Sequence, residues 1–355
     1  FWKEYQRDSL DNKGLILTGT VHYGREYQNA FWNGQQMVFG DGDGEIFNRF
    51  TIAIDVVAHE LSHGVTETEA GLIYFEQSGA LNESLSDVFG SLVKQYHLKQ
   101  TADKADWLIG EGLLAKGING KGLRSMSEPG TAYDDPLLGK DPQPAHMKDF
   151  IKTREDNGGV HLNSGIPNRA FYLAATAIGG YAWEKAGYAW YDTVCDRNLA
   201  QDADFEAFAK LTIAHGEKRS GSDVGAAIKQ AWEQVGVLYM QVPELTDDAV
   251  VELAREGGVA FIPKLSGQRT IALSSLNEAQ RQRLVSILEQ AFPRGQPPGQ
   301  ASSPGSGDQR YFRIQIIWTG QNQAHYADII VLVPEQEAPE SLVELWQKGE
   351  GCVCD

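Results

Sequence analysis

The segment His59-Glu60-Leu61-Ser62-His63 places two histidines four positions apart, with a glutamate directly after the first. In an α-helix, positions i and i+4 project from nearly the same face, so the two imidazoles could hold one metal ion between them. Glu60 would then lie beside a metal-bound water, where a carboxylate can act as a base. This arrangement is what zinc-dependent hydrolysis of peptide bonds requires, although a catalytic zinc needs a third protein ligand. Two surface histidines on an ordinary helix remain the alternative.

A third ligand is available further along the chain, in the run from Ser78 to Leu92. Ser78 and Gly79 suit the N-terminal boundary of a second helix, whose apolar residues then recur at helical spacing. Glu83 and Asp87 share one face of this helix. Glu83 could complete the ligand set, and Asp87 could orient a ligating imidazole through its other nitrogen. Alternatively, this is an amphipathic helix with two solvated acids.

These motifs lie within a longer series of ordered blocks between Phe1 and about Val237. The blocks are Val21 to Tyr23, Asn29 to Gly34, Gly40 to Gly44, Asp55 to Thr66, Gly71 to Tyr74, Ser78 to Asp87, Leu123 to Ser127 and Asp156 to Gly165. Together they resemble the thermolysin-like neutral metalloproteases, and within them the protealysin branch. The resemblance implies an α+β zincin catalytic domain over residues 1–238, mostly helical in its C-terminal lobe.

The resemblance also implies roles for individual residues. It makes His59, His63 and Glu83 the ligands of one catalytic zinc, with Glu60 as the general base. The remaining implied roles fall into two groups. The first acts on the oxyanion or supports the ligands: His161 and Tyr74 bind the oxyanion, Asp156 orients His161, and Asp87 and Asn82 support His59 and His63. The second binds substrate: Asn29, the backbone of Ala30, and Arg124 hold its main chain, while Phe47, Phe50, Val56 and Leu123 line the pocket after the scissile bond.

The apolar pocket favours a bulky hydrophobic residue after the scissile bond. Other interpretations stay open: the four pocket residues could be ordinary core residues. Arg124 could be a structural ion-pair partner, Asp156 a turn residue and His161 a buried histidine.

Calcium-rich members of the family use a paired calcium site whose positions correspond here to Asp55, Lys94, Asp106, Leu108 and Glu111. Lys94 and Leu108 replace two of the expected acids. Calcium takes six to eight oxygen ligands, and an ammonium group in the site repels the cation. We therefore expect no calcium here, with Lys94 as the positive partner of the three acids. A surface helix face with loose acids is the alternative.

Composition limits the classes of partner. The net charge of −17 disfavours nucleic acids and anionic membranes, and no apolar run is long enough to span a bilayer. Cys195, Cys352 and Cys354 are too few for a disulfide framework. The sequence starts in the middle of the family pattern, so we expect that the N-terminal part of the catalytic domain is missing. Secretion is the expected location, with a cytoplasmic one open.

A second domain is expected after residue 238. Residues 239–247 read as a linker, and residues 248–355 as a small α+β domain with an antiparallel sheet. Its expected strands are 251–256, 259–263, 269–273, 312–318 and 327–333. A capping box at Ser275 to Glu278 would open a helix to about Ala291, a flexible loop would follow at 294–308, and a helix from Pro339 to Lys348 would end the domain.

The run Val251 to Pro263 and the elements after it resemble emfourin, the small protein inhibitors of thermolysin-like proteases. The expected function is therefore a zinc metalloendopeptidase acting on peptides and proteins, with a C-terminal domain that contacts the cleft in cis. A regulatory or inhibitor protein with a non-functional protease half is the alternative. A peptide-binding pseudo-enzyme is disfavoured because Glu60, His161 and Tyr74 are all present.

Overall fold

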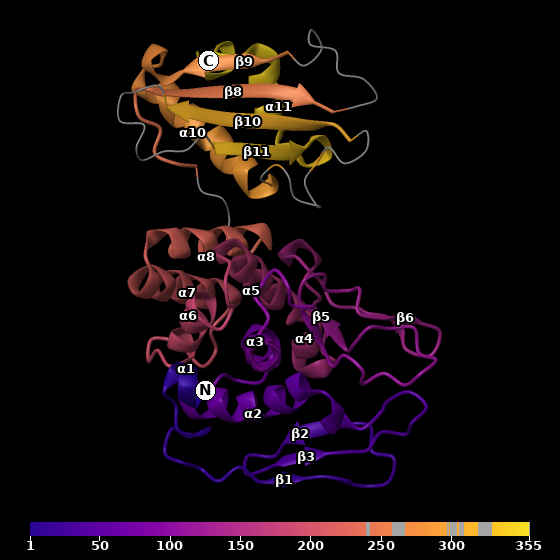
Figure 1. Cartoon of the computed structure of the whole chain (residues 1–355). Helices are drawn as coiled ribbons and strands as arrows, with labels where there is room; N and C mark the ends of the chain where they lie inside the picture. Colours follow the sequence, from indigo (N-terminus) through magenta and orange to yellow (C-terminus); the bar gives the residue numbers. More distant parts are fainter. Residues whose placement is uncertain are drawn as a thin grey trace. The chain divides into compact units, whose positions relative to one another are not determined.

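The computed structural model describes residues 1–238, 242–257, 267–296, 298, 304, 309–318 and 329–354. The chain divides into two compact units, Phe1–Leu238 and Tyr239–Asp355 (Figure 1). Each unit has a hydrophobic core of its own. None of the described helices is both long and apolar enough to cross a membrane.

The first unit opens with the short helix α1 (Trp2–Tyr5) and a small sheet beside helix α2 (Ile54–Glu69). Strands β1 (Gly19–Thr20), β3 (Met37–Phe39) and β2 (Ala30–Trp32) lie in that order. β1 runs parallel to β3 and β2 antiparallel to it. β2 therefore forms one edge of the sheet, next to helix α2, which follows the 3-10 turn η1 (Phe50–Ile52).

Helices α2 and α3 (Glu76–Leu98) carry the metal-ligand candidates and pack against each other. α3 is buried along most of its length, with α2, α4 and α5 against it (Figure 1). Gly90 makes the close approach feasible, because a Cβ there would lie 2.5 Å from the backbone oxygen of Asp55 on α2. The absence of a side chain at this position thus sets the spacing of the two helices.

Helices and short strand pairs complete the first unit. They are β4 (Leu108–Ile109) with β5 (Arg124–Ser125), β6 (Asp134–Asp135) with β7 (Gly139–Lys140), η2 (Met147–Asp149), α4 (Asp156–Asn163), α5 (Gly165–Ile178), α6 (Lys185–Val194), α7 (Phe205–Ser220) and α8 (Ser222–Gln234). Their aromatic core includes Trp190 stacked on Trp232, with ring centroids 5.9 Å apart. This lobe is mostly helical, as predicted.

The second unit is a four-stranded antiparallel sheet with helices on one face (Figure 1). The strand order is β11 (Ile329–Pro334), β10 (Tyr311–Trp318), β8 (Ala249–Glu256) and β9 (Arg269–Ala272). Ile314 on β10 lies between Leu253 and Val331 in register, and all three side chains are buried. Helices α10 (Glu278–Ala291) and α11 (Glu340–Lys348) cover this face. The unit also contains the 3-10 turns η3 (Leu273–Ser275), η4 (Phe292–Arg294) and η5 (Glu335–Glu337) and the short helix α12 (Gly351–Cys354).

Two local predictions are wrong. Helix α3 begins at Glu76 rather than near Ser78, and Gly79 serves close packing, because a Cβ there would lie 2.4 Å from Val160 Cγ1. The capping box of α10 uses Asn277 and Gln280, which exchange side-chain and backbone hydrogen bonds. The predicted strand 259–263, residue Ala327 and most of the predicted loop 294–308 lie outside the described residues.

Candidate metal centre and cleft

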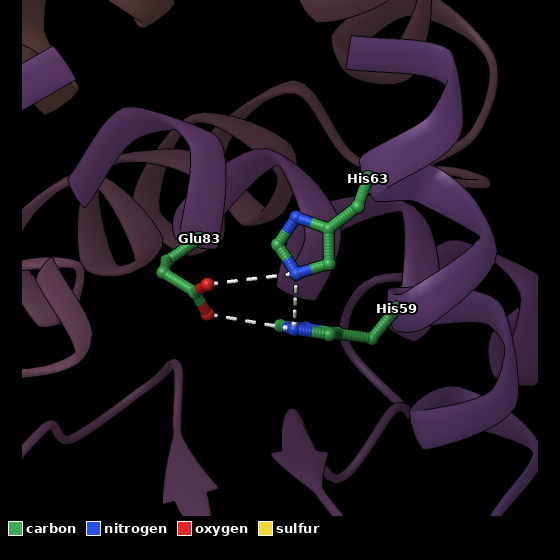
Figure 2. A group of neighbouring side chains, drawn as sticks. All are labelled: His59, His63 and Glu83. Atoms are coloured by element: carbon green, nitrogen blue, oxygen red, sulfur yellow. Dashed lines mark hydrogen bonds and ion pairs between the residues drawn. The ribbon is translucent and has the colours of Figure 1, made fainter. Parts of the chain in front are cut away.

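Three side chains from α2 and α3 converge on one point (Figure 2). His59 Nε2 lies 3.1 Å from His63 Nε2, and 3.4 Å from Glu83 Oε2. His63 Nε2 lies 3.5 Å from Glu83 Oε1. A tetrahedral zinc ion with bonds of about 2.0–2.1 Å separates its ligand atoms by about 3.3 Å, so the three donor atoms have the spacing of such a site.

The opposite ring nitrogen of each histidine has an oxygen acceptor. His59 Nδ1 lies 2.7 Å from Asp87 Oδ1, and His63 Nδ1 lies 2.8 Å from Asn82 Oδ1. A proton on each Nδ1 satisfies these contacts and leaves both Nε2 lone pairs directed at the common point. The supporting roles expected for Asp87 and Asn82 therefore match the contacts found.

The Glu83 carboxylate is suited to a cation. Its Oε2 is buried and has no hydrogen-bond partner among the described residues, which is costly unless an ion occupies the position beside it. Burial opposes ionisation, but protonated imidazoles of His59 and His63 outweigh it and hold the pKa of Glu83 well below its usual value. With neutral imidazoles, a bound cation would take over this role as the positive partner. An ionised, partly unsatisfied carboxylate between two imidazole lone pairs fits Zn²⁺ in charge and in donor type.

Glu60 lines the same cleft from the turn between the two histidines. Burial is the largest influence on this carboxyl group, and it raises the pKa of Glu60 to about 7. A carboxylate of this kind can both take and return a proton near neutral pH, which is the property required of a general base.

His161 reaches the cleft from an unusual turn at the start of α4. Four successive residues, 156–159, have positive φ angles between 49° and 83°. Gly158 and Gly159 adopt this conformation without a Cβ penalty. Asp156 then fixes His161 twice, accepting from its backbone N–H at 2.8 Å and lying 2.6 Å from its Nδ1. Tyr74 Oη lies 3.3 Å from His161 Nε2 and also donates a hydrogen bond to Glu83.

Arg124 is engaged mainly with Asp87. Its Nε and Nη2 donate to the two Asp87 oxygens, each at 2.7 Å, and its side chain also borders the cleft. Both the predicted substrate contact and the ion-pair alternative are therefore compatible with its position. Asn168 on α5 donates a further bond to Asp87 Oδ2 at 2.8 Å, a contact that sequence reasoning missed. Gln143, also missed, donates to the backbone oxygen of His161 at 2.7 Å.

The donor atoms open into a cleft of about 630 Å³. It is lined by Asn29, Ala30, Phe31, Trp32, Phe50, Val56, His59, Glu60, His63, Glu67, Gly71, Leu72, Tyr74, Asn82, Glu83, Leu123, Arg124 and His161. Three of the four predicted apolar pocket residues are among them. Phe47 is not: it packs behind Phe50, with ring centroids 5.6 Å apart. Trp32 and Glu67 line the cleft without having been predicted.

Lys94 on α3 occupies the centre of the expected acidic cluster. Its Nζ lies 2.7 Å from Asp106, 3.1 Å from Glu111 and 3.6 Å from Asp55. Burial alone would lower the pKa of Lys94, but these carboxylates outweigh it and raise the value. The ammonium group is the positive partner of the three acids, as expected. It links α3 to Asp55 on α2 and to the two segments that flank β4, which carry Asp106 and Glu111.

The fold and the site define a thermolysin-like metallopeptidase. Residues 1–67 match the family described as "Thermolysin metallopeptidase, catalytic domain", and residues 70–237 match its "alpha-helical domain". The chain belongs to this family. Residues 253–350 match the emfourin family.

Named relatives agree with this assignment. The chain is similar to an extracellular metalloprotease of Pectobacterium carotovorum subsp. carotovorum, 74% identical over 68% of this chain and 70% of that protein. Protease PrtS of Photorhabdus sp. (strain Az29) is 62% identical over 67% of this chain and 65% of that protein. The solved precursor of protealysin, a metalloproteinase from Serratia proteamaculans, is 81% identical, with a TM-score of 0.67, covering 67% of this chain and 74% of that one.

The shared length is limited. The chain spans about two thirds of the Pectobacterium and Photorhabdus proteins, and 41% of a thermolysin of Alicyclobacillus acidocaldarius subsp. acidocaldarius that is 41% identical to it. The family matches at residues 1–67 and 70–237 fall within the unit that holds the candidate metal centre.

Proposed function

We propose that this chain is a zinc-dependent endopeptidase. The observation that carries the proposal is the convergence of His59, His63 and Glu83 at zinc-ligand spacing on a cleft that Glu60 also lines. Membership of the thermolysin metallopeptidase family supports it. When bound there, zinc would supply the Lewis acidity that activates water and polarises a peptide carbonyl.

The protein's own groups would then act on the substrate. Glu60 would take a proton from the attacking water and pass it to the nitrogen of the leaving amine. His161 and Tyr74 would donate hydrogen bonds to the oxygen that becomes negative, and Asp156 would hold His161 in place for this. Removal of one such donor typically costs about 3 kcal/mol of transition-state stabilisation.

The substrate would lie along the edge strand β2. Asn29, the backbone of Ala30, and Arg124 would bind its main chain. Phe50, Val56 and Leu123 would receive the side chain after the scissile bond, which favours a bulky hydrophobic residue because burial of a Leu or Phe side chain contributes about 1.5–3 kcal/mol. Phe47 would act only through Phe50.

We also propose regulation in cis by residues 239–355. Residues 253–350 match the emfourin family, and the resemblance to emfourin implies inhibition of thermolysin-like proteases, which supports this proposal. A tether supplies an effective concentration of about 1 mM, so that even weak docking would reduce activity. Removal of residues 246–355 should raise peptidase activity; unchanged activity would refute inhibition in cis.

A second candidate function follows from the same match. The chain would then be a regulator of other thermolysin-like proteases, with an inactive protease half. Residues 246–355 added to a separate thermolysin-like protease would inhibit it if this function holds. A chain that also cleaves peptides would exclude the inactive-half version.

Two further features belong to the proposal. Lys94 would replace calcium in the cluster of Asp55, Asp106 and Glu111, which leaves the site independent of that cation. Secretion is the proposed location, since the Pectobacterium relative is named an extracellular metalloprotease.

Cleavage of casein by the purified chain, measured with and without a chelator, tests the main proposal. We expect cleavage that the chelator abolishes and added zinc restores. Absence of cleavage by the zinc-saturated chain, also after removal of residues 246–355, would overturn it.

A further inference from the structure

Glu67 lies at one end of the cleft and has no part in the proposed chemistry. Along α2, positions 56, 60, 63 and 67 share one face, and all four side chains line the cleft. Val56 belongs to the pocket after the scissile bond, and Glu67 lies about 16 Å further along the helix axis at about 1.5 Å per residue. Since the metal ligands lie between them, Glu67 faces the part of a substrate that precedes the bond.

The charge of Glu67 is free to meet a ligand. Besides Glu67, the cleft is lined by two carboxylates, those of Glu60 and Glu83, and by one arginine, Arg124. Arg124 is not paired with Glu67, because its guanidinium group donates to Asp87. Among the residues that the structure describes, no Lys, Arg or His lies within ion-pair distance of Glu67. Its side chain is exposed, and its Oε2 accepts a hydrogen bond of 3.2 Å from the indole N–H of Trp32.

We propose that Glu67 selects substrates with a basic side chain, Lys or Arg, on the N-terminal side of the scissile bond. The indole N–H of Trp32 donates to one oxygen of the carboxylate at the cleft lining, and the other oxygen would accept from an ammonium or guanidinium group of the substrate. The indole face beside it suits the aliphatic stem and the cation of the same side chain. The net charge of −17 further favours the approach of cationic peptides. This inference rests on the proposed function.

The alternative role for Glu67 is to hold Trp32 in place. Glu67→Gln separates the two roles, because the amide keeps an oxygen that accepts from the indole but loses the charge. Trp32→Phe removes the indole donor and keeps the carboxylate. Glu206→Gln, on the exposed surface of α7, is the matched control for loss of one negative charge.

The test uses quenched fluorescent peptides with Leu after the scissile bond. Each of the three positions before the bond is varied between Arg and citrulline, which has nearly the same shape without the charge. We expect the full chain to prefer Arg over citrulline at one position by about fivefold in kcat/KM. The difference should come from a lower KM for the Arg peptide, and it should decrease as salt is added. Glu67→Gln should abolish it without changing cleavage of the citrulline peptides, whereas Glu206→Gln should retain it in full. Trp32→Phe, which loses the donor that holds the carboxylate but keeps its charge, should weaken the preference without abolishing it.

Equal rates for Arg and citrulline at all three positions, or a preference that persists in Glu67→Gln, would overturn the inference. Binding of the same peptides to Glu60→Gln, with and without Glu67→Gln, measures selection without catalysis. If no peptide is cleaved, the proposed function fails, and the ratio of the Arg and citrulline Kd values still decides the role of Glu67.

Discussion

Replacement of Lys94 by methionine should destabilise the first unit and leave the second unchanged. Lys94 Nζ holds three carboxylates, and the side-chain exposure differs among them: 2% for Asp55, 32% for Asp106 and 57% for Glu111. Without the ammonium group, Asp106 and Glu111 can turn to solvent. Asp55 stays buried, and the backbone N–H groups of Val56 and Gly110 are the donors that remain to it among the described residues.

The magnitude follows from this difference. Removal of one partner from a buried ion pair typically costs about 3–5 kcal/mol, and the two remaining donors to Asp55 place this case near the lower end. For a unit of this size each kcal/mol shifts Tm by about 2–4 °C, so Lys94→Met should lower Tm by about 10 °C. Lys104→Met is the control, because Lys104 is 74% exposed and pairs only with exposed Asp103; its effect should stay within about 0.5 kcal/mol.

Calcium provides the sharper half of the test. Lys94→Glu adds a fourth carboxylate to the cluster and should create a calcium site, since Ca²⁺ prefers several carboxylate oxygens. Calcium at a hundred times its Kd would stabilise that variant by about 2.7 kcal/mol. Scanning calorimetry of the full chain, which separates the transitions of the two units, measures both effects. A Tm of Lys94→Met within about 2 °C of the parent, or a calcium response of the parent equal to that of Lys94→Glu, would refute the reasoning.

Four further predictions concern helices α2 and α3. Glu60→Gln should keep its zinc, because Glu60 is not a ligand, yet lower kcat by about 10²–10⁴ in a casein assay; retained activity would contradict its role as base. Gly90→Ala should lower Tm and kcat together, since its Cβ would lie 2.5 Å from the Asp55 backbone oxygen, and overpacking costs about 1–3 kcal/mol; an unchanged Tm would argue against tight packing there. Asp87 has a lowered pKa, since Arg124 and His59 outweigh its burial, so its contribution to stability is present above about pH 4 and is lost as pH falls through its folded pKa. Lys94 has a raised pKa, so its contribution is present below about pH 10 and is lost as pH rises through the folded pKa; Tm measured against pH should lack this alkaline loss in Lys94→Met.

The convergence of the candidate metal ligands was predictable because their spacing is a local property. His59 and His63 lie one helical turn apart, and Glu83 and Asp87 repeat this spacing on the next helix. A helix period fixes which face each pair shares, so the convergence required only that the two helices pack together. The lack of a side chain at Gly90 allows the two helices to approach closely at the Asp55 backbone, and no pattern in the sequence marks this contact.

The residues that were missed depend on the tertiary arrangement. Asn168 and Gln143 are polar residues in otherwise ordinary segments, and only the packing of α5 and α4 brings them to Asp87 and His161. Glu67 extends the metal-ligand face of α2 by one turn, so helical periodicity from His63 could have found it. Phe47 was predicted to line the pocket but packs against Phe50 instead. Residue type and sequence position alone do not distinguish a side chain that lines a pocket from one that packs behind the lining.

The capping box illustrates a competition between overlapping signals. Ser275 with Glu278, and Asn277 with Gln280, both have the required types at compatible spacing. The structure uses Asn277, because Ser275 belongs to a preceding 3-10 turn in which its hydroxyl donates to the Ala272 backbone oxygen. Local sequence predicts the existence of such a helix better than its first residue.

Metal content compared between the parent chain and His63→Ala tests the central claim most directly. After saturation with zinc and removal of excess metal, the parent should hold one zinc per chain. His63→Ala should hold almost none, while calorimetry shows that its second unit unfolds as before. A parent chain that retains clearly less than one zinc under these conditions, or a variant that retains as much as the parent, would contradict the account.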